Sequence, residues 1–258
     1  MIEVLARLGD GDTTTWNVRR DGRVLGTAET NRRRSGPLLT GLDVPRDAAS
    51  DVLDALLDAV REPGVQSLIV DVTPGDPVLE AALHGREVRL MATQMLLDLA
   101  VPVSPPDRVV LRPMSAAEFA GYREHLVAAY AQDMVDAGAF DDLPAALVAS
   151  EQSTVELLPD GVDTSGQHLW TAYDGDMVVG ILWIAVDGPK AFIFDIEVRE
   201  EQRRRGYGQE MLDAGAVAAV ELGARTLGLN VFGHNAGALA LYERSGYDTT
   251  ERTFRVPI

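Results

Sequence analysis

The sequence contains no cysteine, no apolar run long enough to span a membrane, and far fewer basic than acidic residues. The lack of cysteine excludes disulfides and thiolate metal sites. The first residues also lack an apolar segment of signal-peptide length, so we expect a cytoplasmic protein without a membrane partner. The net charge of -17 predicts a surface that repels nucleic acid. The histidines are scattered without ligand spacing, and we expect no metal site.

The segment VPVSPP at residues 101–106 is the clearest boundary in the chain. Its three prolines end any helix or strand and form a stiff, extended connector. The chain of 258 residues is long enough for one large domain or two modest ones. We therefore predict two domains, residues 1–104 and residues 107–258.

The same order of elements is predicted in both halves: hairpin, strand, helix, strand, short helix, strand. Apolar periodicity and turn residues place these elements at 16–30, 38–44, 47–61, 65–72, 77–83 and 88–99, and again at 168–186, 191–198, 206–222, 225–232, 236–244 and 248–256. The segment 88–99 is ambiguous between strand and helix. The second half adds a strand from 109 and helices over 116–137 and 143–158. This pattern indicates an internal repeat, with chance similarity of α/β patterns as the alternative.

The stretch FIFDIEVREEQRRRGYGQEML, residues 192–212, is the most informative in the chain. An apolar strand leads into a loop with three arginines, 203–205, and with Gly206 and Gly208, and a helix follows directly. Free backbone N–H groups at a helix start bind anions, and glycine permits their close approach. The loop matches neither the dinucleotide fingerprint nor the nucleotide-triphosphate loop. We interpret it as a phosphate site; a solvated basic turn is the alternative.

The corresponding loop of the first half, residues 45–50, has no glycine and one arginine. Asp47 stands at the start of the following helix, where a carboxylate already occupies an anion site. If the repeat is real, only the second copy binds a phosphate.

Two motifs together make the C-terminal part resemble the GCN5-related N-acetyltransferases (GNAT), over residues 107–258. The first is R-x-x-G-x-G at 203–208, and the second is N-A-x-A-x-x-x-Y-x-x-x-G-[FY] at 235–247. The first half looks like a degenerate second copy without a cofactor loop. The resemblance implies an α/β (α+β) fold with a mixed, mostly antiparallel central sheet flanked by helices, as two GNAT-like units in tandem.

The resemblance also implies that acetyl-CoA is the co-substrate, with no metal. Backbone N–H groups from residues 205–209 would hold the pyrophosphate, and the N–H of Val198 would polarise the thioester carbonyl. Asn235 would contact the pantetheine arm; its alternative role is capping the helix that follows. The expected cofactor-binding residues are Ile196, Val198, Arg203, Arg204, Arg205, Gly206, Tyr207, Gly208, Gln209 and Asn235.

Tyr242 is the expected general acid, because a phenol within reach can protonate the leaving thiolate. The alternative is a tyrosine of the core. Alternation along the focal strand predicts Phe192, Phe194, Ile196 and Val198 on one face and Asp195 and Glu197 on the other.

Two carboxylates on one face of a buried strand should raise the pKa of one of them, toward a value useful for taking a proton. The general base is Glu197, or a water relayed by Asp195, or no dedicated base exists. Asn230 stands where some family members carry a glutamate, and it cannot accept a proton. His234, beside Asn235, is a further candidate.

The predicted activity is transfer of an acetyl group from acetyl-CoA to a primary amine of a small molecule by direct attack. Acidic residues between 133 and 156 favour a cationic acceptor, although a solvated acidic face is the more typical explanation. The alternatives are acetylation of protein or peptide amino groups, and an acyl-CoA sensor or scaffold without turnover. The protein is expected to be a monomer or a homodimer.

Overall fold

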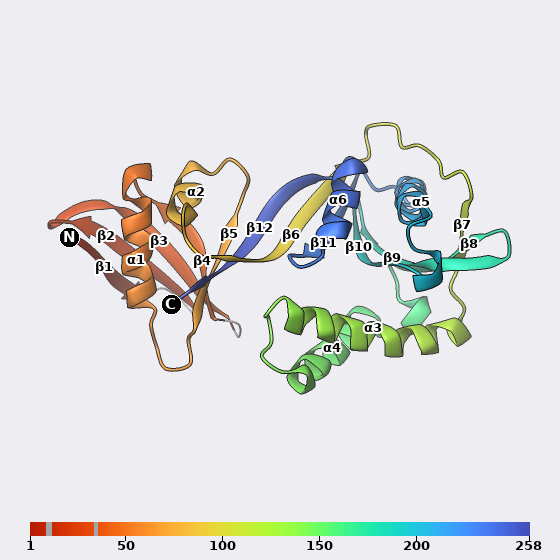
Figure 1. Ribbon diagram of the computed structural model, residues 1–258, viewed down its shortest axis with the longest axis horizontal. Coiled ribbons are helices and arrows are strands. Elements are labelled where there is room, and N and C mark those ends of the chain that lie inside the picture. The colour runs from red at the N-terminus through yellow and green to blue at the C-terminus, as the bar shows by residue number, and fades with distance from the viewer. Residues whose placement is uncertain (9–11, 34–35) are drawn as a thin grey trace. The chain divides into compact units, whose positions relative to one another are not determined.

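The computed structural model describes residues 1–8, 12–33 and 36–258, and its contacts divide the chain into two compact units (Figure 1). One unit comprises Met1–Thr93 and Thr250–Ile258, and the other comprises Gln94–Thr249. β6 (Arg89–Asp98) and β12 (Asp248–Pro257) each pass from one unit into the other. The boundary predicted near residue 106 would place β6 entirely in the first half and β12 entirely in the second. Within the described residues, no helix combines the length and apolarity needed to span a membrane.

The first unit is a sheet with two helices. Its strands lie in the order β1-β2-β3-β4-β5-β12. Their bounds are Ile2–Leu8, Thr13–Arg20, Arg23–Arg33, Gly36–Asp43 and Ser67–Val72 for β1 to β5, and the helices are α1 (Ala49–Ala59) and α2 (Pro77–Leu83). The predicted hairpin turn at Asp21-Gly22 is confirmed, with φ of 52° and 78°. β1 was not predicted from the sequence.

The second unit has helices on both faces of its sheet (Figure 1). The strands lie in the order β6-β11-β10-β9-β8-β7. The additional bounds are Val109–Pro113, Gln167–Asp174, Met177–Asp187, Lys190–Val198 and Thr226–Phe232 for β7 to β11, and Ala116–Asp136, Leu143–Leu157, Tyr207–Glu221 and Ala236–Arg244 for α3 to α6. On β9, Leu182 packs in the core with α5, whereas its neighbour Trp183 packs with α3. Because neighbouring strand residues point to opposite faces, α5 and α3 cover opposite faces of the sheet.

The two units repeat the same irregularities in strand pairing. Val18 lies opposite Gly26 immediately before a register shift, and Ala172 lies opposite Gly180 before an equivalent one. A Cβ atom on Gly26 would lie 1.8 Å from the carbonyl oxygen of Asp43 on β4. One on Gly180 would lie 2.2 Å from the carbonyl oxygen of Glu197 on β10. Both glycines are therefore required for close strand contact. These matching defects, together with the repeated element order, support an internal duplication.

Candidate active site

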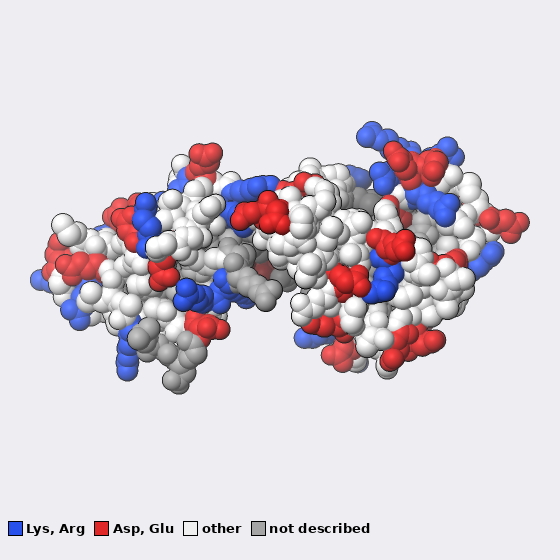
Figure 2. Space-filling view, turned by 90° about the horizontal axis from the view of Figure 1, so that it is seen from below, with Lys and Arg blue, Asp and Glu red and all other residues white. Residues whose placement is uncertain are grey.

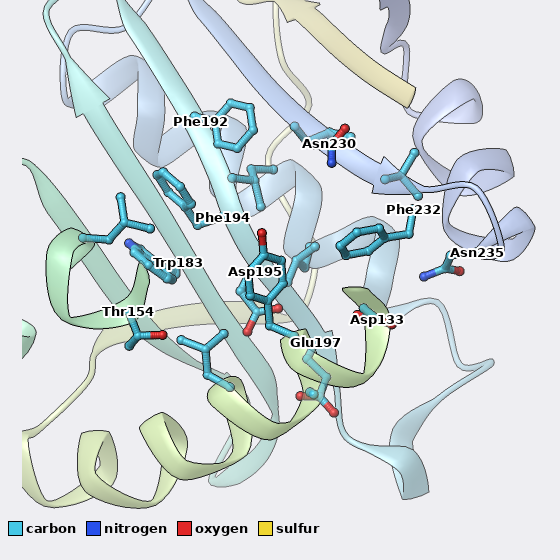
Figure 3. A pocket seen from close by; sticks show the side chains of 18 of the residues that line it. Asp133, Thr154, Trp183, Phe192, Phe194, Asp195, Glu197, Asn230, Phe232 and Asn235 are labelled. Carbon is cyan, nitrogen blue, oxygen red and sulfur yellow. The ribbon is translucent and has the colours of Figure 1, made fainter. Parts of the chain in front are cut away.

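β10 and β11 form an opening in the sheet of the second unit. They run parallel and pair from Lys190 with Thr226 to Ile193 with Leu229, and then diverge (Figure 3). The backbone N–H of Arg199 donates to the carbonyl of Val179 on β9 at 2.9 Å. Because successive N–H groups of a strand point to opposite sides, the N–H of Val198 faces the opening.

A cavity of about 680 Å³ occupies this opening, within the usual size range of small-molecule sites. Its walls come from α3, α4, β9, β10, β11, α6 with its N-cap, and the loop residue Arg203. Of the expected site residues, the lining includes Ile196, Glu197, Arg203, Asn235 and Tyr242. The cavity thus brings together residues separated by over one hundred positions in the sequence.

The expected division of β10 into two faces is only partly correct. Asp195 and Glu197 do share a face, but Phe192 and Phe194 line the same cavity with them. Ile196 and Val198 pack against the core, although Ile196 also adjoins the cavity. The physical reason is a β-bulge: Ile193 pairs with Ile184 while Asp195 pairs with Trp183, so one residue is inserted at Phe194. An inserted residue reverses the alternation that follows it.

Asp195 is held against α3. Its Oδ2 accepts a hydrogen bond from the Tyr122 hydroxyl at 3.0 Å, and its carboxylate also accepts from the backbone N–H of Ile196. Burial raises the pKa of Asp195 to about 6, with the charge of Glu197 acting in the same direction and the two hydrogen bonds opposing it. The expected raised carboxyl pKa is therefore found at Asp195.

Glu197 is held between two cationic or titratable side chains. Its Oε2 lies 2.6 Å from Nε2 of His125, and its Oε1 lies 3.6 Å from an Nη of Arg203. His125 and Tyr122 are three residues apart on α3 and so lie on one helical face. Neither was predicted as a site residue, because their proximity to β10 arises from helix–sheet packing alone. His234, the alternative base, instead contacts Asp133 at 3.2 Å.

Tyr242 and Asn235 each have a structural role and also line the cavity. Tyr242 is 8% exposed and packs in the core, yet it also lines the cavity. Burial and the neighbouring Asp195 raise the pKa of its hydroxyl to about 12. The side chain of Asn235 caps α6 by accepting from the N–H of Ala238 at 3.1 Å, and it too lines the cavity. A protonated phenol and an amide are thereby fixed at the β11 side.

The loop before α5 presents backbone N–H groups. After a 3₁₀ turn at Glu200–Gln202, Arg204 and Gly206 adopt positive φ values of 61° and 89°. Gly206 is the N-cap of α5 and offers no side-chain cap. Among the described residues, no hydrogen-bond partner is found for the backbone N–H groups of 204–206. Such a succession of free N–H groups at a helix start suits an anion.

Side chains around the loop hold its conformation. Arg108 binds the Glu210 carboxylate through Nε at 2.8 Å, donates to the Arg205 carbonyl at 3.3 Å, and lies 4.7 Å from the Tyr207 ring centroid. The Tyr207 side chain is buried, and its hydroxyl donates to Asp174 at 2.7 Å. Arg108 was not predicted, because it lies just before β7, far from the loop in the sequence.

Two further predicted residues have side chains engaged within the protein. Gln209 donates to Asp213 and accepts from Ser245, each at 2.9 Å. Arg203 donates through Nε to the Val198 carbonyl at 3.1 Å, beside its contact with Glu197. Arg203 therefore connects the loop to the end of β10. All three arginines of the loop are exposed.

The acidic residues of α3 and α4 mostly serve local structure. Asp142 caps α4, and Glu151 forms an ion pair with Arg123. On the face of the second unit that bears these helices, Figure 2 shows acidic groups separated from one another rather than one continuous patch. Asp133 differs, since it lines the cavity and burial raises its pKa. Across the described residues, no group of His, Asp and Glu is arranged to hold a metal ion.

Comparison with known proteins places this site in a family context. The model of the acetyltransferase (GNAT) family matches residues 135–247. Two Bacillus subtilis proteins described as uncharacterized N-acetyltransferases, YycN and YdgE, are 36% and 32% identical over 148 and 150 residues. The alignments cover 55% and 56% of this chain, and 94% and 95% of those proteins.

Solved structures agree with these similarities. The crystal structure of the B. subtilis YycN acetyltransferase matches with a TM-score of 0.53, covering 55% of this chain and 93% of that one at 36% identity. A GCN5-related N-acetyltransferase from Sphaerobacter thermophilus matches with a TM-score of 0.59 at 17% identity, over 97% of this chain and 82% of that one. At that low identity the second match shows a common fold.

Proposed function

Because this chain belongs to the GNAT acetyltransferase family, we propose that it transfers an acetyl group from acetyl-CoA to a primary amine of a small molecule. One observation carries the proposal: β10 and β11 diverge after Ile193 and Leu229, and the opening leads to a loop of free N–H groups. In this proposal residues 107–258 contain the working site. Residues 1–104 form a degenerate copy, whose helix α1 follows a loop without glycine and with Asp47.

The residues present suit acetyl-CoA. Backbone N–H groups at 205–208 hold the pyrophosphate, supported by the free N–H groups observed at 204–206. The N–H of Gln209, expected to take part, instead donates to the Gly206 carbonyl at 3.1 Å. The backbone of Ile196 and Val198 lies along the opening, and the N–H of Val198 is directed to polarise a carbonyl there. Asn235 contacts the pantetheine arm of acetyl-CoA while its side chain caps α6. Acetyl-CoA supplies an acetyl thioester, whose C–S bond breaks as the amine nitrogen bonds to the carbonyl carbon.

Two side chains transfer protons in the proposed reaction. Tyr242 donates a proton to the departing thiolate; its pKa of about 12 keeps the hydroxyl protonated at neutral pH. Glu197 accepts the proton of the amine. Arg203 and His125 hold its carboxylate in place, at 3.6 Å and 2.6 Å. Asp195, which is buried against Tyr122, is the alternative and acts through a relayed water.

The proposal is tested by measuring thiol release from acetyl-CoA with a panel of primary amines. Tyr242→Phe should lower kcat by about 10- to 100-fold while leaving coenzyme A binding unchanged. Tyr173→Phe is the matched control, because Tyr173 lies on β8 outside the cavity. Glu197→Gln should shift the pH–rate profile, and an unchanged profile would remove Glu197 from the role of base.

A second candidate function is an acyl-CoA sensor without turnover. It is favoured by one observation: both candidate bases are already engaged, Asp195 with Tyr122 and Glu197 with His125 and Arg203. Calorimetric binding of coenzyme A without turnover of any amine would favour the sensor. Location in the cytoplasm and assembly as a monomer or homodimer stay predictions.

A further inference from the structure

Three aromatic side chains form a continuous wall on one side of the cavity, which we call the aromatic wall: Trp183, Phe192 and Phe194 (Figure 3). The rings of Trp183 and Phe194 stack with centroids 4.7 Å apart and planes at 22°. Phe192 meets Phe194 edge to face at 5.1 Å. The indole N–H of Trp183 donates to Gln167 at 2.7 Å, so its polar atom is already satisfied and only apolar ring surface adjoins the cavity.

The aromatic wall is built by the bulge in β10 and by a glycine in β11. The bulge inserts Phe194 on the cavity side and leaves it 39% exposed, which is high for a phenylalanine at the centre of a sheet. A Cβ atom on Gly228 would lie 3.1 Å from the ring of Phe192, so the glycine makes room for that ring. Trp183 is only 3% exposed and backs the aromatic wall, so the accessible apolar surface is that of Phe192 and Phe194. A ligand that covers this surface gains hydrophobic free energy.

Carboxylates stand next to the aromatic wall along the same strand. Glu197 lies three residues beyond Phe194, which at a strand rise of about 3.3 Å per residue is roughly 10 Å away. Asp195 lies between them, and Asp133 enters from α3. The cavity therefore has an apolar, flat side and a negatively charged side separated by a short span.

We propose that the acceptor is an arylalkylamine: a primary amine joined by a short carbon chain to an aromatic ring. The ring stacks on the aromatic wall and the ammonium group lies at Glu197. This inference rests on the proposed acetyltransferase function and narrows its acceptor class. A polyamine also suits the carboxylates, but it would leave the aromatic wall uncovered.

The reaction balances with groups already named. Glu197 takes one proton from the ammonium group, and the free amine forms a C–N bond with the acetyl carbonyl carbon. The C–S bond breaks and the thiolate takes a proton from Tyr242. One of the two N–H protons still on the nitrogen is lost to solvent, and the amide keeps the other. Glu197 releases its proton to solvent and the tyrosine is reprotonated through water, so the products are an N-acetyl arylalkylamine and coenzyme A.

The experiment compares kcat/KM of the full-length protein for 2-phenylethylamine, n-hexylamine and spermidine with acetyl-CoA. The wild type should prefer 2-phenylethylamine by about 10-fold or more, since stacking adds to the area that either apolar amine buries. Phe194→Ala should lower kcat/KM for 2-phenylethylamine by about 10-fold while changing that for spermidine by less than about 3-fold. Phe194→Leu keeps apolar volume and should have a smaller effect of about 5-fold.

Val148→Ala is the matched control, because Val148 is a 70% exposed apolar residue of α4 outside the cavity. It should leave all three amines unaffected. Equal or better use of spermidine or n-hexylamine by the wild type would overturn the acceptor class while the acetyltransferase function stands. An unchanged preference in Phe194→Ala would overturn the role of the aromatic wall. Coenzyme A binding without turnover of any amine would instead refute the enzyme function, and this inference with it.

Discussion

Replacement of Asp195 by asparagine should make the protein more stable, and increasingly so as the pH rises. The folded-state pKa of Asp195 is raised to about 6 by burial, whereas an aspartate in an unfolded chain titrates near 4. The folded protein therefore binds the proton more tightly than the unfolded chain. The contribution of this group to stability is fully present below about pH 4 and is lost as the pH rises through about 6.

The magnitude follows from the elevated pKa. One pKa unit corresponds to about 1.4 kcal/mol, so keeping Asp195 ionised at pH 8 costs up to about 3 kcal/mol of folding free energy. Asparagine has the same shape, carries no charge, and can still accept the hydrogen bond from Tyr122. For a chain of this size, about 3 kcal/mol corresponds to a rise in Tm of roughly 6 to 12 °C. At pH 4 the two proteins should have nearly equal Tm.

Thermal unfolding of wild type and Asp195→Asn between pH 4 and pH 8 checks this prediction. Asp187→Asn is the control, because Asp187 is an exposed carboxylate at the end of β9 and should give a small, nearly constant difference. A difference in Tm that stays flat with pH would refute the reasoning. A variant less stable than wild type at pH 8 would show that the ionised carboxylate is favoured by its surroundings, contrary to the burial argument.

Three further predictions concern the close strand contact at Gly180, the loop at 203–208, and the strand β6. Gly180→Ala should lower the free energy of unfolding by about 3 kcal/mol or more, since its Cβ would meet the β10 carbonyl at 2.2 Å; Gly121→Ala, in open space on α3, should stabilise by up to about 1 kcal/mol in the same urea titration. Arg108→Ala should weaken coenzyme A binding about 10-fold by calorimetry, because Arg108 holds the loop, whereas Arg112→Ala on β7, the strand that follows Arg108, should not. Deletion of residues 1–104 should abolish soluble expression, because it removes β6 from the sheet and core of the second unit; a soluble, active fragment would contradict this.

Most elements could be predicted from the sequence because their causes are local. The type of turn at Asp21-Gly22 requires positive φ, which these residues tolerate, and it defines the hairpin. The ambiguous segment 88–99 is resolved as β6, since its side chains alternate between buried and exposed within a sheet. Periodicity alone left it open because short apolar segments suit either structure. β1 was missed although Ile2, Val4 and Ala6 alternate with Glu3 and Arg7, and its pairing with β2 defines it as a strand.

The candidate site was only partly predictable. The loop at 203–208 and the capping Asn235 were found because glycine, charge and a following helix occur together in the sequence. Arg203 was expected to bind phosphate, yet its side chain contacts Val198 and Glu197. Which groups the Arg203 side chain contacts depends on where β10 ends relative to the loop, and no local sequence pattern specifies this.

The sequence by itself determined the strand–loop–helix order, the internal repeat and the family, since each depends on residues close together in the chain. Only the tertiary structure decided which side chains face the cavity. The bulge at Phe194 is defined by pairing with β9, and it places two phenylalanines beside two carboxylates on one face. Tyr122 and His125 meet those carboxylates only because α3 packs on that face. Contacts of this kind join residues far apart in the chain, and the sequence of one segment does not specify which other segment packs against it.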